Sequence, residues 1–378
     1  MWNHLPFDIL ANIFSYLPPH SLACANAVCR HWHACATAWP LQPRQHPPWF
    51  MALPARNCEL GCLAHNPVCD SWVELPLDFV PNPVRPVGSK EGLVLFRVQS
   101  SRNFRLAICN PFTQEYRQLP MLNVERSSPA VGVVATNTGQ SAPLSSYKSQ
   151  SAPLSSYKIY VAGGMSERPG SIATYEPMLE MYDSDHDKWQ ILGPMPIEFA
   201  VRLTVWTPND NVYSEGKLYW MTSARAYSIM CFDIGTNTWK ELKVPMADRL
   251  EFAALVQQTG KLTLVGGIGG GDACVWQLSE GNKWDLIQKV PYVIKRKLLG
   301  ENASWEHTNC VGSDKAIYLY KDVWSGMAVW REVENGRWEW FWIEGYSVRG
   351  KSKRLQNFPL KGLLLHPNLA HFVSIENK

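Results

Sequence analysis

Apolar side chains near the start of the chain recur with the period of an α-helix. They fall at i, i+1, i+4, i+5 and i+8, which places them along one broad helical stripe. The members of this stripe are Ile9, Leu10, Ile13, Phe14 and Leu17. Pro6 suits the first turn of such a helix, Asp8 suits the positive end of its dipole, and Pro18-Pro19 ends it.

A second short helix is expected from Ser21, which is a suitable N-terminal cap. Its apolar side chains recur at intervals of three or four residues, at Leu22, Ala25, Cys29 and Trp32. About 30 residues of this kind cannot close a core by themselves. The pattern therefore predicts two short helices whose apolar face packs against another surface.

Beyond residue 70 the pattern changes to short β-rich runs that repeat along the chain. Each copy holds two such runs, a turn rich in Asp, Asn and Gly, and a Trp followed by an apolar pair. Four copies are complete and end near Pro196, Pro245, Pro291 and Gly345. Two weaker copies precede them, "AHNPVCDSWVELPL" and "GLVLFRVQSSRNFRLAICNPFTQEYRQLP". Internal repetition is therefore the main structural signal in this region.

One aromatic residue anchors each of the six copies. The anchors are Trp72, Tyr116, Trp189, Trp239, Trp284 and Trp338, separated by 44, 73, 50, 45 and 54 residues. A period near 50 residues, with about four short strands per copy, predicts a β-propeller of about six blades. Each Trp is expected to pack against the neighbouring blade, and Gly163-Gly164 and Gly266-Gly267 to allow a tight backbone where strands crowd the axis.

The propeller is expected to close by joining two incomplete copies. The copy at Trp72 looks like a terminal fragment without strands before it, and residues 358–375 hold strand-like runs without a following Trp. Each fragment lacks what the other has, so Trp72 and Leu363 to Leu365 should share one sheet. The predicted organisation is a small all-α segment over residues 1–40, a linker over residues 41–69 and an all-β propeller over residues 70–378.

Composition narrows the function classes. The chain of 378 residues is 46% hydrophobic and 18% charged, which is typical of folded domains. A net charge of +3 is too small to indicate a nucleic-acid surface, and no apolar run approaches the length of a membrane span. The ten scattered cysteines and the lack of a signal sequence favour an intracellular protein of the cytoplasm, the nucleus or both.

The diglycine, aromatic and Trp order resembles the kelch repeat, and with the N-terminal segment the whole chain resembles the plant F-box/kelch-repeat proteins. The residues that match the F-box pattern are Leu5, Pro6, Asp8, Ile9, Leu10, Ile13, Leu17, Pro18, Leu22, Val28, Cys29, Arg30 and Trp32. The kelch match is less complete, because only two copies keep the diglycine and the Tyr116 copy lacks the Trp.

This resemblance implies that the F-box docks on the adaptor subunit of a cullin-RING (SCF) ubiquitin ligase, while the propeller holds a protein to be ubiquitinated. The residues expected to bind the adaptor are Leu5, Pro6, Ile9, Leu10, Ile13, Phe14, Leu17, Pro18, Leu22, Val28, Cys29 and Trp32. For the target protein we expect a propeller face carrying Arg202, Trp206, Arg225 and Tyr227, because Trp, Tyr and Arg often anchor interfaces. Either arginine is also suited to a structural ion pair between blades.

Candidate metal and catalytic motifs are incomplete. Cys58, Cys62, His65 and Cys69 give a C-x3-C-x2-H-x3-C order, which departs from the C-x2-C pairs of zinc sites, so we expect no metal. "DSDHDK" lacks the Gly and Glu of a calcium loop and is expected to be the turn before Trp189. "GGIGGGD" lacks the Lys of a phosphate loop, and no hydrolase motif is present. The sequence therefore predicts no cofactor and a non-catalytic protein.

Two other function classes remain open at this point. A kelch scaffold or transcriptional cofactor would bind partners without promoting their degradation and would tolerate loss of the F-box stripe. A propeller enzyme would need a polar cluster at the axis. The tandem copies "QSAPLSSYKS" and "QSAPLSSYKI", from Gln140 to Ile159, add no periodic apolar face and predict a longer loop.

Overall fold

The computed structural model of the chain describes most of its 378 residues. The described ranges are residues 5–38, 47–55, 61–81, 84–90, 92–99, 104–135, 156–166, 172–205, 211–302, 304–333, 336–347 and 359–368. The tandem copies, Cys58 and Trp206 lie outside these ranges, apart from the last residues of the second copy. Within the described ranges, no helix is both long and apolar enough to cross a bilayer.

The N-terminal segment forms three short helices rather than two. They are α1 (Phe7–Ser15), α2 (Pro19–Asn26) and α3 (Arg30–Ala38). The expected second helix is wrong in detail, because α2 ends at Asn26 and a new helix begins at Arg30. Pro18 rather than Ser21 stands at the N-cap of α2. The third helix gives this segment a core of its own, made of Leu10, Ala11, Phe14, Leu22, Ala25 and Cys35.

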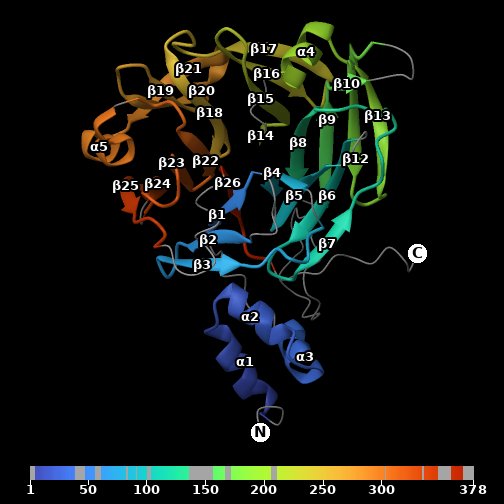
Figure 1. The fold of residues 1–378 in the computed structure, drawn as a ribbon, viewed down its shortest axis with the longest axis vertical. Coiled ribbons are helices and arrows are strands. Elements are labelled where there is room, and N and C mark those ends of the chain that lie inside the picture. Colours follow the sequence, from blue (N-terminus) through green and yellow to red (C-terminus); the bar gives the residue numbers. More distant parts are fainter. Residues whose placement is uncertain are drawn as a thin grey trace.

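Six four-stranded antiparallel sheets form the blades of a propeller, which confirms the predicted fold and blade count (Figure 1). In every blade the strands follow one another from the inner to the outer edge of the ring. The first is β26 (Leu360–Leu365), β1 (Trp49–Pro54), β2 (Cys62–Asn66) and β3 (Ser71–Leu75); the second is β4 (Val84–Lys90), β5 (Leu93–Gln99), β6 (Phe104–Asn110) and β7 (Glu115–Gln118); the third is β8 (Ala130–Ala135), β9 (Tyr157–Ala162), β12 (Met178–Asp183) and β13 (Lys188–Pro194).

The other three blades follow the same order. The fourth is β14 (Asn211–Ser214), β15 (Lys217–Ser223), β16 (Tyr227–Asp233) and β17 (Thr238–Lys243); the fifth is β18 (Leu250–Gln258), β19 (Lys261–Ile268), β20 (Ala273–Ser279) and β21 (Lys283–Lys289); the sixth is β22 (Asn309–Ser313), β23 (Ala316–Tyr320), β24 (Met327–Glu332) and β25 (Trp338–Ile343). The inner strands of neighbouring blades contact one another around the axis.

Short elements connect some of these strands. They are the hairpin β10 (Met165–Ser166) and β11 (Thr174–Tyr175), the helices α4 (Ile197–Val205) and α5 (Tyr292–Leu299), and the 3-10 turns η3 (Glu280–Asn282) and η4 (Gly300–Asn302). The sequence pattern did not predict α4 or α5.

The ring closes through the first blade. β26 pairs with β1 over six residues, with Trp49 opposite Leu365 and Pro54 opposite Leu360. Trp72 and Leu363 to Leu365 therefore share one sheet, as predicted. The expected linker over residues 41–69 is wrong from Trp49 onward, because β1 and β2 are buried strands of this blade and precede Trp72. They escaped the repeat analysis because both are buried on both faces and show no alternation.

In the described part of the propeller the core consists of six clusters, each shared by two neighbouring blades. A single twisted sheet cannot bury both faces alone, so each blade depends on the next. The outer-strand Trp residues reinforce these contacts. Three of them donate a hydrogen bond from Nε1 to a backbone carbonyl at or just after the end of the outer strand of the preceding blade. These bonds are Trp72 to Glu344 (3.1 Å), Trp189 to Pro120 (2.9 Å) and Trp284 to Lys243 (2.9 Å).

The propeller has two faces, which we name by their relation to the helices. The near face carries α1–α3: the ring of His20 in α2 lies 5.7 Å from that of Trp49, which starts β1, and Trp49 packs on Phe112 in the β6–β7 turn. The far face lies at the other end of the strands. It holds the connections from each outer strand to the next inner strand, including α4, whose Ala200 carbonyl lies beside Gly163 just after the end of β9.

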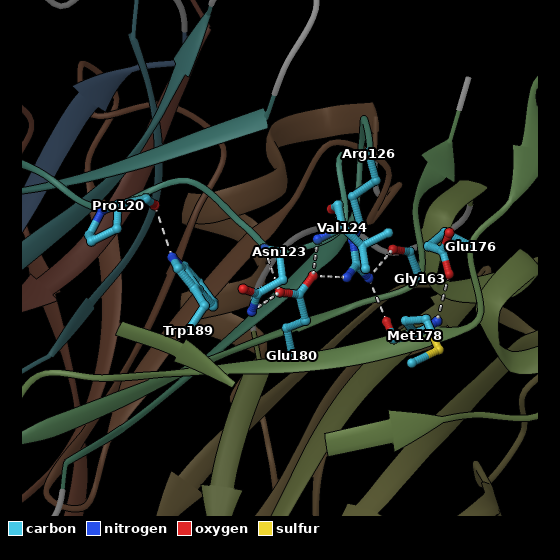
Figure 2. A network of polar contacts seen from close by, with 9 residues as sticks. All are labelled: Pro120, Asn123, Val124, Arg126, Gly163, Glu176, Met178, Glu180 and Trp189. Atoms are coloured by element: carbon cyan, nitrogen blue, oxygen red, sulfur yellow. Dashed lines mark hydrogen bonds and ion pairs between the residues drawn. The ribbon is translucent and has the colours of Figure 1, made fainter. Parts of the chain in front are cut away.

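A buried ion pair fixes the far face of the third blade (Figure 2). The side chains of Arg126 and Glu180 are fully buried and paired with each other. Glu180 also accepts hydrogen bonds from the backbone N–H groups of Asn123 (2.8 Å) and Val124 (3.1 Å), and Arg126 donates to the Gly163 carbonyl (3.2 Å). The network ties the connection between the second and third blades to β12.

Gly163 and Gly164 sit beside this network with positive φ angles of 68° and 112°. A Cβ on Gly163 would lie 3.0 Å from the Ala200 carbonyl of α4, and one on Gly164 would lie 2.9 Å from the Ser127 carbonyl. The predicted tight backbone is present, but its expected place at the axis was wrong. The glycines instead let α4 and the preceding connection approach the blade.

Candidate interaction surfaces

The N-terminal helices expose an apolar surface that their own core leaves uncovered. On α1, Ile9 is 46% exposed and Ile13 is 40% exposed, and Tyr16 continues the same i, i+4, i+7 line at 82%. Val28, between α2 and α3, is 58% exposed. Solvent-exposed apolar side chains that are clustered in this way are typical of a protein-binding surface.

The structure divides the predicted adaptor-binding residues into three groups. Leu10, Phe14 and Leu22 are buried in the core of the three helices. The half-buried members are Leu5, Leu17, Pro18, Cys29 and Trp32, and the exposed members are Pro6, Ile9, Ile13 and Val28. Sequence reasoning missed Phe7 and Tyr16, which are also exposed. Tyr16 was accessible to that reasoning, because it lies seven residues after Ile9.

The joint between the helices and the propeller uses α2 and leaves this apolar surface free. His20 packs edge-on against Trp49, and Ala23 packs against the core shared by the first two blades. Burial lowers the pKa of His20 below its usual value, and its Nδ1 is buried without a hydrogen-bond partner. The lowered pKa favours the neutral form of the imidazole at this joint.

On the far face, the predicted target-binding residues differ in their surroundings. Arg202 lies on α4 and pairs with Glu241 of β17, and its Nη1 also donates to the Ser228 hydroxyl. Tyr227, at the start of β16, is half-buried and donates its hydroxyl to the Glu251 carbonyl (3.4 Å). Arg225, in the β15–β16 connection, is exposed. Arg202 therefore joins two blades, whereas Arg225 points into solvent.

The two unpredicted helices add exposed apolar side chains to the far face. On α4, Ile197 is 54% exposed and Val205 is 51% exposed. On α5, Tyr292 is 73% exposed and Val293 is 67% exposed. The 3.6-residue period of "IEFAVRLTV" was available in the sequence as a signal for α4. The far face thus offers apolar and basic side chains together.

The residues weighed as zinc ligands take part in blade packing where the structure describes them. Cys62 and His65 are buried in β2, and Cys69 is exposed. His65 Nε2 lies 3.0 Å from Asp70 Oδ1, and its ring packs against Trp72. Among the described residues, no group of three or more His, Cys, Asp or Glu side chains is placed to hold a metal ion. The "DSDHDK" stretch forms the turn between β12 and β13, just before Trp189, as predicted.

Comparisons with known proteins agree with this architecture. Residues 2–39 match the F-box-like family, and residues 76–266 match the family described as F-box associated beta propeller domain. The second match covers just over half of the chain.

The chain is also similar to several plant proteins. It is 25% identical over 334 residues to F-box only protein 6 of Arabidopsis thaliana, which covers 84% of this chain and 64% of that protein. Protein UNUSUAL FLORAL ORGANS of the same plant is 21% identical over 374 residues, covering 91% and 78%. An Arabidopsis F-box/kelch-repeat protein is 23% identical over 361 residues, covering 91% and 82%. The chain thus spans less than two thirds of the length of F-box only protein 6.

Among solved structures, a chain of the nidogen/laminin complex is 9% identical and has a TM-score of 0.48. The alignment covers 85% of this chain and 99% of that one.

Proposed function

The chain belongs to the F-box proteins with an F-box-associated β-propeller, and from this membership we propose that it is the substrate-recognition subunit of an SCF-type cullin-RING ubiquitin ligase. F-box proteins are in general non-catalytic subunits of such ligases, and an F-box implies binding to the ligase adaptor. In this proposal α1–α3 bind the adaptor and the far face of the propeller binds a target protein for ubiquitination.

The observation that carries the proposal is the separation of two exposed surfaces. Ile9 and Ile13 leave an apolar line on α1, while the joint to the propeller is made by His20 and Ala23 of α2. An amphipathic helix with a free apolar line is suited to a hydrophobic groove on a partner. The adaptor can therefore bind without displacing the propeller.

The far face is the better candidate for the target. It lies at the other end of the strands from the contact between His20 and Trp49, so a bound target would not compete with the adaptor. Arg225 is exposed there, whereas Arg202 is engaged with Glu241. Exposed arginines often anchor protein interfaces. We therefore assign target binding to Arg225 and the exposed parts of α4, and a joining role to Arg202.

An affinity purification with separate variants tests this function. Wild-type protein should recover both ligase subunits and target proteins. The Ile9→Ala/Ile13→Ala variant should lose the ligase subunits and keep the targets, and Arg225→Ala should do the reverse without a change in melting temperature. If the recovered partners have the same cellular abundance with the wild-type protein and with the F-box variant, the protein is instead a scaffold that does not promote their degradation.

A further inference from the structure

Two arginines lie directly opposite each other on neighbouring strands of the second blade. Arg85 of β4 and Arg97 of β5 are Cα partners in the antiparallel register, so their side chains leave the same face of the sheet. The pair is at the far-face end of the blade. The other end of these strands is the near-face end, because β6 runs there into the turn that holds Phe112, which contacts Trp49. Neither residue was singled out by sequence reasoning.

No carboxylate balances these two charges within the described part of the chain. The arginines that do form ion pairs there are Arg117, Arg126, Arg202 and Arg337. Arg97 instead lies over the ring of Phe104, with its Cζ 5.1 Å from the ring centroid. The Nε of Arg85 is buried and has no hydrogen-bond partner. Both residues are half-buried, so each keeps part of its surface accessible to solvent.

This arrangement lowers the stability of the free protein. Like charges directly opposite each other on a sheet are destabilising, and a buried N–H without an acceptor adds to that cost. Burial, and secondarily the neighbouring Arg85, lower the pKa of Arg97 from its usual value, but a guanidinium stays protonated in proteins. In the adjacent blade, by contrast, Glu180 balances the charge of the buried Arg126, whose side chain also donates a hydrogen bond to the Gly163 carbonyl (Figure 2).

We propose that the Arg85–Arg97 pair is an anion-binding site that receives a negatively charged side chain of the target protein. Two arginines opposite each other on one face of the sheet offer planar donor forks that match a carboxylate or a phosphoryl group, and the Phe104 ring fixes the position of one of them. The inference rests on the proposed function for the source of the anion. It specifies the target as a protein with an anionic segment that reaches the far face of the second blade.

Binding of labelled peptides to the purified full chain tests the site directly. Three probes are compared at fixed ionic strength: a hexaglutamate peptide, a Gly-Ser peptide carrying one phosphoserine, and an oligothymidylate of the same net charge as hexaglutamate. Wild-type protein should bind one or both peptides more tightly than the oligonucleotide. Arg85→Gln/Arg97→Gln should weaken that binding by about tenfold or more, since hydrogen bonds to charged groups are strong.

Matched variants separate binding from folding. Arg331 is another half-buried arginine over an aromatic ring, 4.3 Å from Phe341, and lies at the near-face end of the sixth blade. Arg331→Gln should leave peptide binding unchanged. Arg85→Gln alone keeps Arg97 on Phe104 and should have a melting temperature equal to or above that of wild type, while still losing most of the binding. Arg85→Lys/Arg97→Lys should bind with intermediate strength, because it keeps the charge without the fork.

The outcomes are distinct. Absence of peptide binding by wild type, equal binding by the double Gln variant, or tighter binding of the oligonucleotide would overturn the proposal. A large fall in the melting temperature of Arg85→Gln would show that the pair supports the blade and would also count against it. Peptide binding needs no ligase subunit, so a protein that binds the peptides but fails to recover the adaptor would refute the receptor function and leave the anion site standing.

Discussion

The apolar line on α1 makes a quantitative prediction about adaptor binding. Ile9→Ala/Ile13→Ala removes side chains that the fold itself leaves uncovered, so their main effect should be on association. Full burial of an Ile is worth about 1.5–3 kcal/mol, and the exposed fractions of 46% and 40% therefore give about 1.3–2.6 kcal/mol for the pair. This corresponds to a roughly 10- to 80-fold weaker complex.

The double variant should stay folded, because Ala has a higher helix propensity than Ile and neither residue belongs to the core of the three helices. Isothermal titration of the purified adaptor against the variant measures the loss, and circular dichroism checks the helices. Ser15→Ala, an exposed position elsewhere on α1, is the matched control and should bind as wild type does.

Leu10→Ala provides the contrast between packing and contact. Leu10 is 1% exposed, so this variant should destabilise the helices by about 2–5 kcal/mol and lose the adaptor only through unfolding. Adaptor affinity of Ile9→Ala/Ile13→Ala within about twofold of wild type, in a folded protein, would refute the assignment of this line as the docking surface.

Three further predictions concern the propeller and its joint. Ending the chain after residue 358 removes β26 and leaves an edge of β1 unpaired, so this protein should be insoluble. A chain that ends after residue 368 keeps β26 and should form a soluble ring. Solubility and light scattering distinguish the two. Arg126→Ala should lower the free energy of unfolding in urea by about 3–5 kcal/mol, and Arg126→Met combined with Glu180→Leu should recover most of it; no recovery would contradict the account of the buried pair. Burial lowers the pKa of His20 below 6.5, so burying the neutral imidazole contributes fully to the free energy of unfolding above about pH 6.5, and this free energy falls as the pH drops below that value. In His20→Phe the free energy of unfolding should fall less steeply between neutral and acidic pH. The same pH dependence in the variant and the wild type would argue against a buried neutral His20.

Much of the propeller could be predicted because each blade carries a local signal. The outer strands begin with anchors such as Trp189 and Trp284, which directly follow a turn, and spacing alone places them. β1 and β2 have no such anchor before them and are buried on both faces, so their membership in the first blade depends on pairing with β26. Long-range pairing of this kind leaves no local pattern in the sequence.

The candidate sites were predicted less completely for a similar reason. Periodicity identifies Leu10 and Ile13 equally as apolar positions of α1, and only the packing of α3 shows that the first is core and the second is surface. The Arg85–Arg97 pair depends on strand register, which sequence spacing does not specify. For Arg202 the sequence left both a target contact and a structural ion pair open, and the pairing with Glu241 of β17 depends on a fold that spacing does not specify.

The closure of the ring through the first blade has a consequence for biosynthesis. β1 and β26, which pair with each other, are about 300 positions apart in the chain. At about 5–20 residues per second, a ribosome needs roughly 15 to 60 seconds to make the chain between them. The three helices have a core of their own and precede β1 in the chain, so they can fold at the start of that interval. The edge of β1 that pairs with β26 stays unpaired until β26 has been made. A nascent chain halted before residue 360 therefore presents folded helices on an open ring.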